Sequence, residues 1–344
     1  MSAPTAPPVP QTPTTPTASA PHLVSWLTRL HRPALSLWTI LVLVLGAALL
    51  WLRGPVTTGA ARAWEQYNAC ALSGPCRYDQ YAILLHKDVY QYATLALLAV
   101  PFLVAAWAGG SLIGREMESG TAHLAWTQGI SPLRWLAAKL ALPAAVVTVG
   151  TGALVLLHPA MWSVGDGRID TAKPWYGFEI FSAGGPLPVA LALAGLAAGA
   201  LVGLVKRRSL AALGGGLGIT GLLWFGVQQA LPHLWPKVTR VSSLQEGPKG
   251  SGIGVETGLL TSSGDRVGDQ GCISGFDPEC RAVLDRVDAV GYYTEYHPRS
   301  HYWPLQLMAS GLLLLVAALL VLAAFRVLHR RTTAPAPARA ETAV

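Results

Sequence analysis

The residues whose types and spacing could do chemistry lie in one polar stretch between two long apolar segments. The stretch begins with a charged group, Arg115, Glu116 and Glu118, and is interrupted at Gly120. A turn follows, and Ser131-Pro132 then supplies a helix cap and a first helical residue. We predict short polar helices joined stiffly to the apolar segments on either side. Such a stretch can be held by another protein and pass a force to the helices, although a loop whose charges only face water would show the same residues.

Patterns that carry catalytic chemistry are absent from the sequence. There is no G-x-x-x-x-G-K-[ST] loop to hold ATP phosphates, no H-E-x-x-H or G-x-S-x-G pattern and no Cys/His metal array. No Asp, Glu, Lys or Arg lies in the middle of an apolar segment, where a proton relay or ion site would place one. The nearest candidates are His158, which we interpret as a residue of the membrane interface, and Glu179 in an outer loop. We predict that the chain is not an enzyme and has no catalytic, cofactor-binding or metal-binding residues.

The composition is typical of a membrane protein. Of the 344 residues, 52% are hydrophobic and 12% are charged, which is about half the charge of an average soluble domain. The charges cluster in short stretches, as expected if a charge at the centre of a bilayer costs about 3 kcal/mol or more. Most of the short basic clusters behind the net charge of +7 lie beside apolar segments, where they orient a membrane protein. We therefore expect contact with membrane lipid and no binding of nucleic acid.

Six apolar segments are long enough to cross a bilayer, which takes about 20 helical residues. They are Ala34–Leu52, Val89–Gly114, Leu140–Leu157, Pro186–Val205, Ser209–Pro232 and Trp303–Phe325. Gly195, Gly199 and Gly203 recur at four-residue spacing, which predicts close helix packing. The predicted fold is an all-α polytopic membrane protein with six transmembrane helices. A secretory signal ending near Ala61-Arg62-Ala63 is the alternative for the first segment, but its apolar run of 19 residues exceeds the ~7–15 of a signal core.

The expected topology places the N- and C-termini in the cytoplasm. The inner segments then carry eleven Lys and Arg residues and the two shorter outer loops carry six, a bias in the direction of the positive-inside rule. The four cysteines, Cys70, Cys76, Cys272 and Cys280, all lie in extracytoplasmic loops, where disulfides persist. We favour the local pairs Cys70–Cys76 and Cys272–Cys280. Four cysteines allow three pairings, however, and a cysteine metal site is the competing interpretation.

The chain divides into five parts by composition. They are a disordered Pro/Thr-rich tail (1–22), helices one to five with the loop 115–139 (23–232), a small disulfide-bearing extracytoplasmic subdomain between helices five and six (233–302), helix six (303–330) and a disordered tail (331–344). Within the subdomain, Asp277-Pro278 and the spacing of Cys280, Val283, Leu284 and Val287 predict an amphipathic helix that ends before Gly291.

The polar stretch resembles the permease subunits of the ABC-2 family of ATP-binding-cassette transporters. The pattern R-E-x-E-x-G-T over Arg115–Thr121 carries the likeness, followed by T-Q-x-[IV]-S, R-W and K-L. The stretch Tyr296–Gln306 is similar to the entry to the last helix in actinobacterial members of that family. His301 and Gly129 depart from the residues expected there. Together with the six spans, the resemblance covers about residues 24 to 330.

This resemblance implies the permease of an ABC exporter, a multi-pass protein of the bacterial cell (inner) membrane. A separate cytoplasmic ABC ATPase, which binds the ATP and Mg²⁺, would grip the coupling loop. The coupling residues would be Arg115, Glu116, Glu118, Gly120, Thr121, Thr127 and Gln128. A second permease chain, identical or paralogous, would complete one pathway. The apolar mid-membrane surface would suit an apolar or amphipathic substrate, whose identity the sequence does not give.

Two other classes of function compete with a permease. A non-transport membrane scaffold or sensor would use the outer subdomain to bind a ligand, and it need not hold an ATPase. A membrane-embedded enzyme or a secondary transporter is disfavoured because the spans are poor in ionisable groups.

Overall fold

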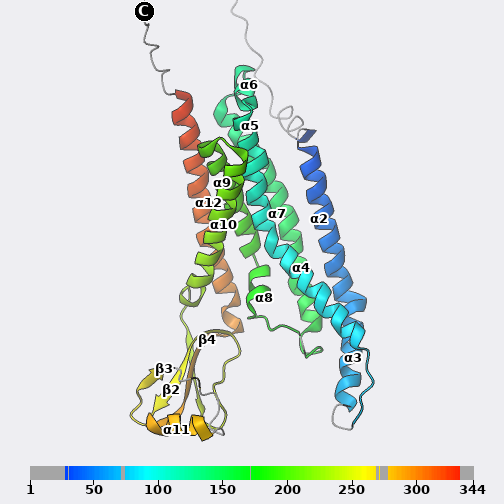
Figure 1. Ribbon diagram of the computed structural model, residues 1–344, viewed down its shortest axis with the longest axis vertical. Helices are drawn as coiled ribbons and strands as arrows, with labels where there is room; N and C mark the ends of the chain where they lie inside the picture. The colour runs from blue at the N-terminus through cyan, green and yellow to red at the C-terminus, as the bar shows by residue number, and fades with distance from the viewer. Residues whose placement is uncertain are drawn as a thin grey trace, which may run out of the picture.

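Six long helices form a bundle, and a small β-sheet lies at one end of it in the computed structural model (Figure 1). The structure describes residues 28–29, 31–70, 74–170, 172–268, 271 and 278–333. The predicted tail 1–22 lies outside the described residues. The final helix continues to Thr333, so the first residues of the predicted tail 331–344 are helical and the rest lie outside the description.

Each of the six predicted spans is a helix that is long and apolar enough to cross a membrane. The first joins α2 (Arg32–Trp51), η1 (Leu52–Val56) and α3 (Thr57–Cys70), and the second joins α4 (Gln80–Trp107), η2 (Ala108–Gly114) and α5 (Arg115–Glu118). The others are α7 (Pro132–Gly165), α9 (Leu187–Lys206), α10 (Ser209–Ala230) and α12 (Tyr302–Thr333). Short helices α6 (Thr121–Thr127), α8 (Phe178–Ala183), η3 (Leu231–His233) and η4 (Arg299–His301) lie between them. The prediction of six spanning helices is confirmed.

The first long helix is broken near its middle. Gly54 has the non-helical angles φ −100° and ψ −110°, and Pro55 follows it. Proline lacks the backbone N–H that an α-helix needs and its ring clashes with the preceding turn, so the helix changes direction here. Beyond the break, α3 becomes polar and ends at Cys70, which forms a disulfide with Cys76. The predicted Cys70–Cys76 pair is confirmed.

Helix α9 lies at the centre of the bundle and packs against α4, α7, α10 and α12. Its glycines allow this close contact, as the four-residue spacing predicted. A Cβ atom at Gly199 would lie 2.4 Å from the carbonyl oxygen of Ala105 on α4, and one at Gly195 would lie 2.8 Å from that of Pro101. The backbones of α4 and α9 can therefore approach each other only because these residues lack side chains.

The segment between α10 and α12 folds into a sheet, so the prediction of an all-α fold is wrong there. Strands β1 (Val238–Ser243), β2 (Ile253–Thr261), β3 (Arg266–Gly268) and β4 (Ala289–His297) form an antiparallel sheet in the order β1-β4-β2-β3. Strand β4 is central and largely buried, because it pairs with β1 on one side and β2 on the other. It leads through Pro298 and η4 directly into α12.

The predicted amphipathic helix of this segment is present as α11 (Pro278–Arg286). Leu284 of α11 is buried with Leu259 and Tyr292 in the core of the sheet, as the apolar spacing requires. The proposed cap Asp277 lies outside the described residues. Cys280 is a free cysteine in this structure, unlike the expected Cys272–Cys280 pair, and Cys272 lies outside the described residues.

A buried carboxylate holds two strands and the start of the sheet together. The Glu295 side chain on β4 forms ion pairs with Lys237 and with Arg266, whose Nη1 lies 2.7 Å from Oε1. Hydrogen bonding to Lys237, together with Arg266, lowers the pKa of the Glu295 carboxyl below its ordinary value. The charged form of Glu295 is therefore bound more tightly in the folded sheet than in the unfolded chain.

The ion pairs of Glu295 predict that the sheet becomes less stable in acid. Because the folded pKa is depressed, the stabilisation from Glu295 is present above the unfolded pKa of about 4.3 and is lost as the pH falls through the folded pKa. In Glu295→Gln, the sheet should melt at a lower temperature than in the wild type at neutral pH, and the difference should shrink on acidification. Near-UV circular dichroism melts at several pH values measure this. The matched control is Glu246→Gln, which removes an exposed pair with Lys249; an equal effect there would contradict the assignment.

Candidate functional site

The predicted coupling residues lie at the end of the bundle opposite to the sheet (Figure 1). We call Arg115–Gln128, which contains α5 and α6, the coupling segment, and the two ends of the bundle the coupling end and the sheet end. The start of α2 and the last turns of α12 also lie at the coupling end.

The turn between α5 and α6 depends on Gly120. Its φ of +75° lies in the left-handed region, which residues with a Cβ atom rarely adopt. The turn stops α5 and starts α6 at Thr121, whose Oγ1 lies 3.0 Å from Ser119 Oγ. At the far end of the polar stretch, Ser131 Oγ accepts a hydrogen bond from the backbone N–H of Arg134 at 3.4 Å, and Pro132 begins α7. The predicted helix break and helix cap are both confirmed.

An ion pair buried under the segment fixes α5 to the neighbouring helices. Glu116 pairs with Lys139 of α7, whose side chain is fully buried. The Nζ atom of Lys139 also lies 2.9 Å from His31 Nε2, just before α2. Three parts of the chain therefore meet at this one ammonium group. The position of Lys139 among Ala and Leu residues is the one signal in the sequence that it is buried.

Glu118 makes a second link, from α5 to α10. Its Oε2 accepts a hydrogen bond from the backbone N–H of Ser209, the first residue of α10, at 2.9 Å. A carboxylate at a helix N-terminus satisfies a free donor and interacts favourably with the helix dipole. Because Glu116 and Glu118 hold different partners, the two acidic residues of the segment connect it to α7 and α10 separately.

The coupling segment has a buried side and an exposed side. Met117 and Ala122 are buried in the same apolar cluster as Trp135 and Leu204 of the bundle. The exposed side presents Arg115, Glu118, Thr121, Leu124, Thr127 and Gln128. Of the seven predicted coupling residues, five are exposed, Glu116 is half-buried in the ion pair and Gly120 forms the turn. The arrangement offers a fixed surface to another protein.

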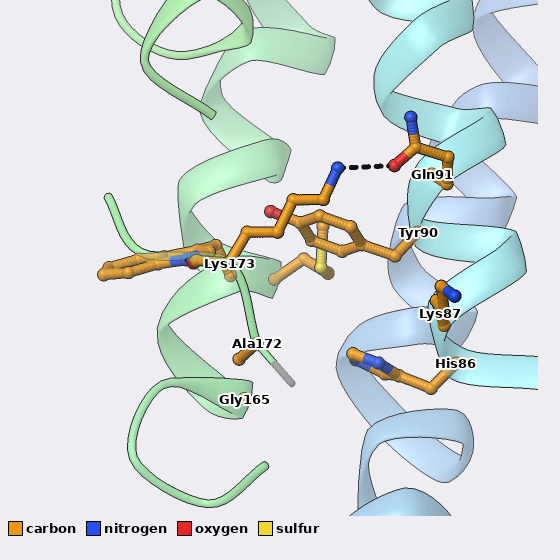
Figure 2. A pocket seen from close by; sticks show the side chains of 9 residues that line it. His86, Lys87, Tyr90, Gln91, Gly165, Ala172 and Lys173 are labelled. Carbon is orange, nitrogen blue, oxygen red and sulfur yellow. Dashed lines mark hydrogen bonds between the residues drawn. The ribbon is translucent and has the colours of Figure 1, made fainter. Parts of the chain in front are cut away.

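A separate polar group lies at the sheet end, between α4 and the loop that follows α7 (Figure 2). Lys173 Nζ lies 2.6 Å from Gln91 Oε1 and forms an ion pair with Glu179. The hydrogen bond from Lys173 lowers the pKa of the Glu179 carboxyl. The side chains of Tyr90 and Lys173 point toward the same small space in Figure 2. Its volume of about 30 Å³ is room for roughly two water molecules. We interpret it as a packing feature, because it is too small for a transported substrate.

His158, interpreted from the sequence as a residue of the membrane interface, is turned into the bundle. Its ring is almost fully buried between α7 and α4, where Nε2 lies 3.2 Å from Thr94 Oγ1 and the ring lies beside Tyr90. Because α7 is apolar on all its faces, the sequence does not show which face is turned into the bundle. Among the described residues, no group of three or more His, Cys, Asp or Glu side chains is placed to hold a metal ion.

Comparison with known proteins gives one match. Residues 39–234 match the family described as "ABC-2 membrane transporter related". No curated protein and no solved structure matches the chain. The matched region contains spans two to five, all but the start of the first span, and the whole coupling segment. Membrane components of this family typically work with an ATPase partner and are generally not catalytic themselves. Since the match covers more than half of its residues, the chain belongs to the ABC-2 membrane transporter related family, as a multi-pass membrane protein.

Proposed function

We propose that this chain is the permease subunit of an ATP-driven exporter in the bacterial cell membrane. The coupling end would face the cytoplasm, with both termini, and the sheet and the Cys70–Cys76 disulfide would lie outside. A separate ABC ATPase would bind the exposed side of the coupling segment and supply ATP and Mg²⁺. A second permease chain would complete the pathway for an apolar or amphipathic substrate.

The observation that supports this proposal most is the way the coupling segment is held. Its outer side is exposed, while Glu116, Met117 and Ala122 fix its inner side to α7 and the bundle core. The exposed Glu118 adds a link to α10. A push on the exposed side would therefore move spans rather than deform a loose loop. A water-facing linker would not need a buried ion pair, whose formation carries a substantial desolvation cost.

The distribution of basic residues supports a cytoplasmic coupling end. Basic residues lie at the helix ends at the coupling end, for example Lys206 and Arg207 at the end of α9 and Arg330 and Arg331 in the last turn of α12. Such residues are enriched on the cytoplasmic side. Beside α6, a hollow of about 480 Å³ is lined by Trp126, Arg207 and Arg331 among others, and it could receive a side chain of the ATPase.

Leu124→Asp tests ATPase docking. Leu124 is 61% exposed on α6, so the change should leave folding intact. It would place a charge in the proposed interface with the ATPase, from which water must be excluded. We expect at least a tenfold loss of affinity for the proposed ABC ATPase partner, measured by co-purification and by titration in detergent. The control is Val241→Asp on β1, where the original residue is 59% exposed at the sheet end. Equal binding by Leu124→Asp and the wild type would refute the docking surface. A protein that never holds an ATPase would be a scaffold or sensor.

A further inference from the structure

A large groove runs between α7, the start of α9 and α12 at the sheet end. Its volume is about 980 Å³, within the range of small-molecule sites. Much of its wall is aliphatic, including Val155, Leu156, Val189, Leu193, Leu307 and Leu314. Gly184 and Gly185 also line it, and a Cβ atom at either position would collide with the side chain of Tyr302 or Gln306 on α12. The groove is open along its side, since Leu156 is 76% exposed, so a chain could enter it from the bilayer.

A positive charge and a ring of aromatic side chains stand at one end of the groove. The Arg299 guanidinium lies 5.4 Å above the Trp162 ring, and Trp175, Tyr302 and Trp303 line the same end. Tryptophan and tyrosine gather at the level of lipid headgroups. The carboxylate paired with Arg299 is Asp166, at 3.8 Å, and both side chains are largely exposed. Such an exposed pair is weak, so Arg299 retains donors for an anion that enters the groove.

The length of the groove matches one leaflet of a membrane. Tyr302 at the aromatic end and Leu314 at the other are twelve residues apart on α12, or about 18 Å along a helix. Half of the ~30 Å hydrocarbon core is about 15 Å. An acyl chain with its head at the aromatic end would therefore follow α12 over the depth of one leaflet.

We infer that this groove binds a single-chain anionic amphiphile, with a phosphate or carboxylate head at Arg299 and the chain along α12. The guanidinium matches the negative charge and the paired oxygens of such a head. A zwitterionic head is a poorer match, because its own cation offsets the negative charge. Treating this ligand as the exported substrate rests on the proposed function. Its binding does not, because the groove belongs to one chain and lies at the end opposite to the coupling segment.

Photo-labelling of the purified chain in neutral detergent tests this inference. The probes are an alkyl phosphate and an alkyl phosphocholine that carry the same diazirine in the same chain, and labelled peptides are mapped by mass spectrometry. We expect the alkyl phosphate to label α7 and α12 at least fivefold more strongly than the phosphocholine. Arg299→Gln should remove this preference. The control Arg240→Gln, an exposed residue of β1, should keep it.

A second pair of variants tests the apolar part of the groove. Leu156→Trp should fill it and reduce labelling by either probe severalfold, whereas Leu222→Trp, which replaces a leucine 73% exposed on α10, should not. Size-exclusion chromatography and melting temperature show whether each variant is folded. Equal labelling by the two probes would overturn the inference. So would a Leu156→Trp variant that changes the oligomeric state and not the labelling, because that result would indicate that a second copy of the chain occupies the groove. Since no ATPase is present, failure here leaves the ATPase docking test untouched.

Discussion

Glu116→Gln is expected to destabilise the protein by about 3–5 kcal/mol, because it leaves the Lys139 ammonium buried without its counter-charge. His31 contacts the same nitrogen at 2.9 Å, but an imidazole carries no negative charge and cannot replace a carboxylate. Thermal unfolding in detergent should show a lower melting temperature, and substrate-stimulated ATP hydrolysis by the complex should fall with it. The loss of coupling follows because α5 is no longer fixed to α7.

Two further variants separate the ion pair from a general effect of mutation. Glu116→Gln combined with Lys139→Met removes both charges and should recover most of the stability, since replacing a buried pair by apolar groups is often neutral. Glu118→Gln removes an exposed carboxylate from the same helix and should lower the melting temperature much less than Glu116→Gln does. If Glu116→Gln melts like the wild type, Lys139 does not depend on Glu116 in the folded protein.

Gly199→Ala should destabilise the bundle by about 1–3 kcal/mol or prevent its assembly. The new Cβ would lie 2.4 Å from the Ala105 carbonyl oxygen and 2.7 Å from the Gly109 backbone nitrogen. Both neighbours are main-chain atoms, so relief requires α9 and the α4–η2 helix to move apart, and overpacking of this kind is costly. The melting temperature and the yield of monodisperse protein measure the effect.

Gly218→Ala on α10 is the matched control. A Cβ atom there would meet nothing within 4 Å, so the change adds a methyl group without a clash. Alanine favours a helix over glycine by up to about 1 kcal/mol, and we expect a neutral or slightly stabilising result. Opposite signs for the same substitution in two neighbouring helices would identify contact between backbones as the cause. Equal effects would contradict the close approach of α9 to α4.

The spans, the break in the coupling segment and the cap of α7 could be predicted because their causes are local. Long runs without charge define the helices, Gly120 allows a left-handed turn, and Ser131-Pro132 is a cap followed by a residue with a preset φ. The same holds for the disulfide between Cys70 and Cys76, which are six residues apart. None of these features needs knowledge of distant parts of the chain.

The features that the sequence analysis missed depend on distant contacts. Glu116 and Lys139 are 23 residues apart, and either could have faced water. Strand β1 pairs with β4, so that Val238 lies opposite Tyr296, while glycines interrupt the β2 region and weaken its strand pattern. Burial of His158 depends on the rotation of α7, which an evenly apolar helix does not reveal in its sequence. Register and rotation are set by packing, and a single sequence gives little information about either.

The direct passage from β4 into α12 makes the sheet a remote indicator of events at the coupling end. Helix α12 has 32 residues and is about 48 Å long, and Arg331 near its last turn donates a hydrogen bond to the Leu204 carbonyl at the end of α9. If α12 tilts as a straight rod by about 5° around that anchor, its other end moves by about 4 Å. The sheet would swing with it, since Pro298 and η4 alone separate the strand from the rod. A spectroscopic label on β1 would thus register movement at the coupling end, and in the proposed permease it would follow the partner's nucleotide cycle.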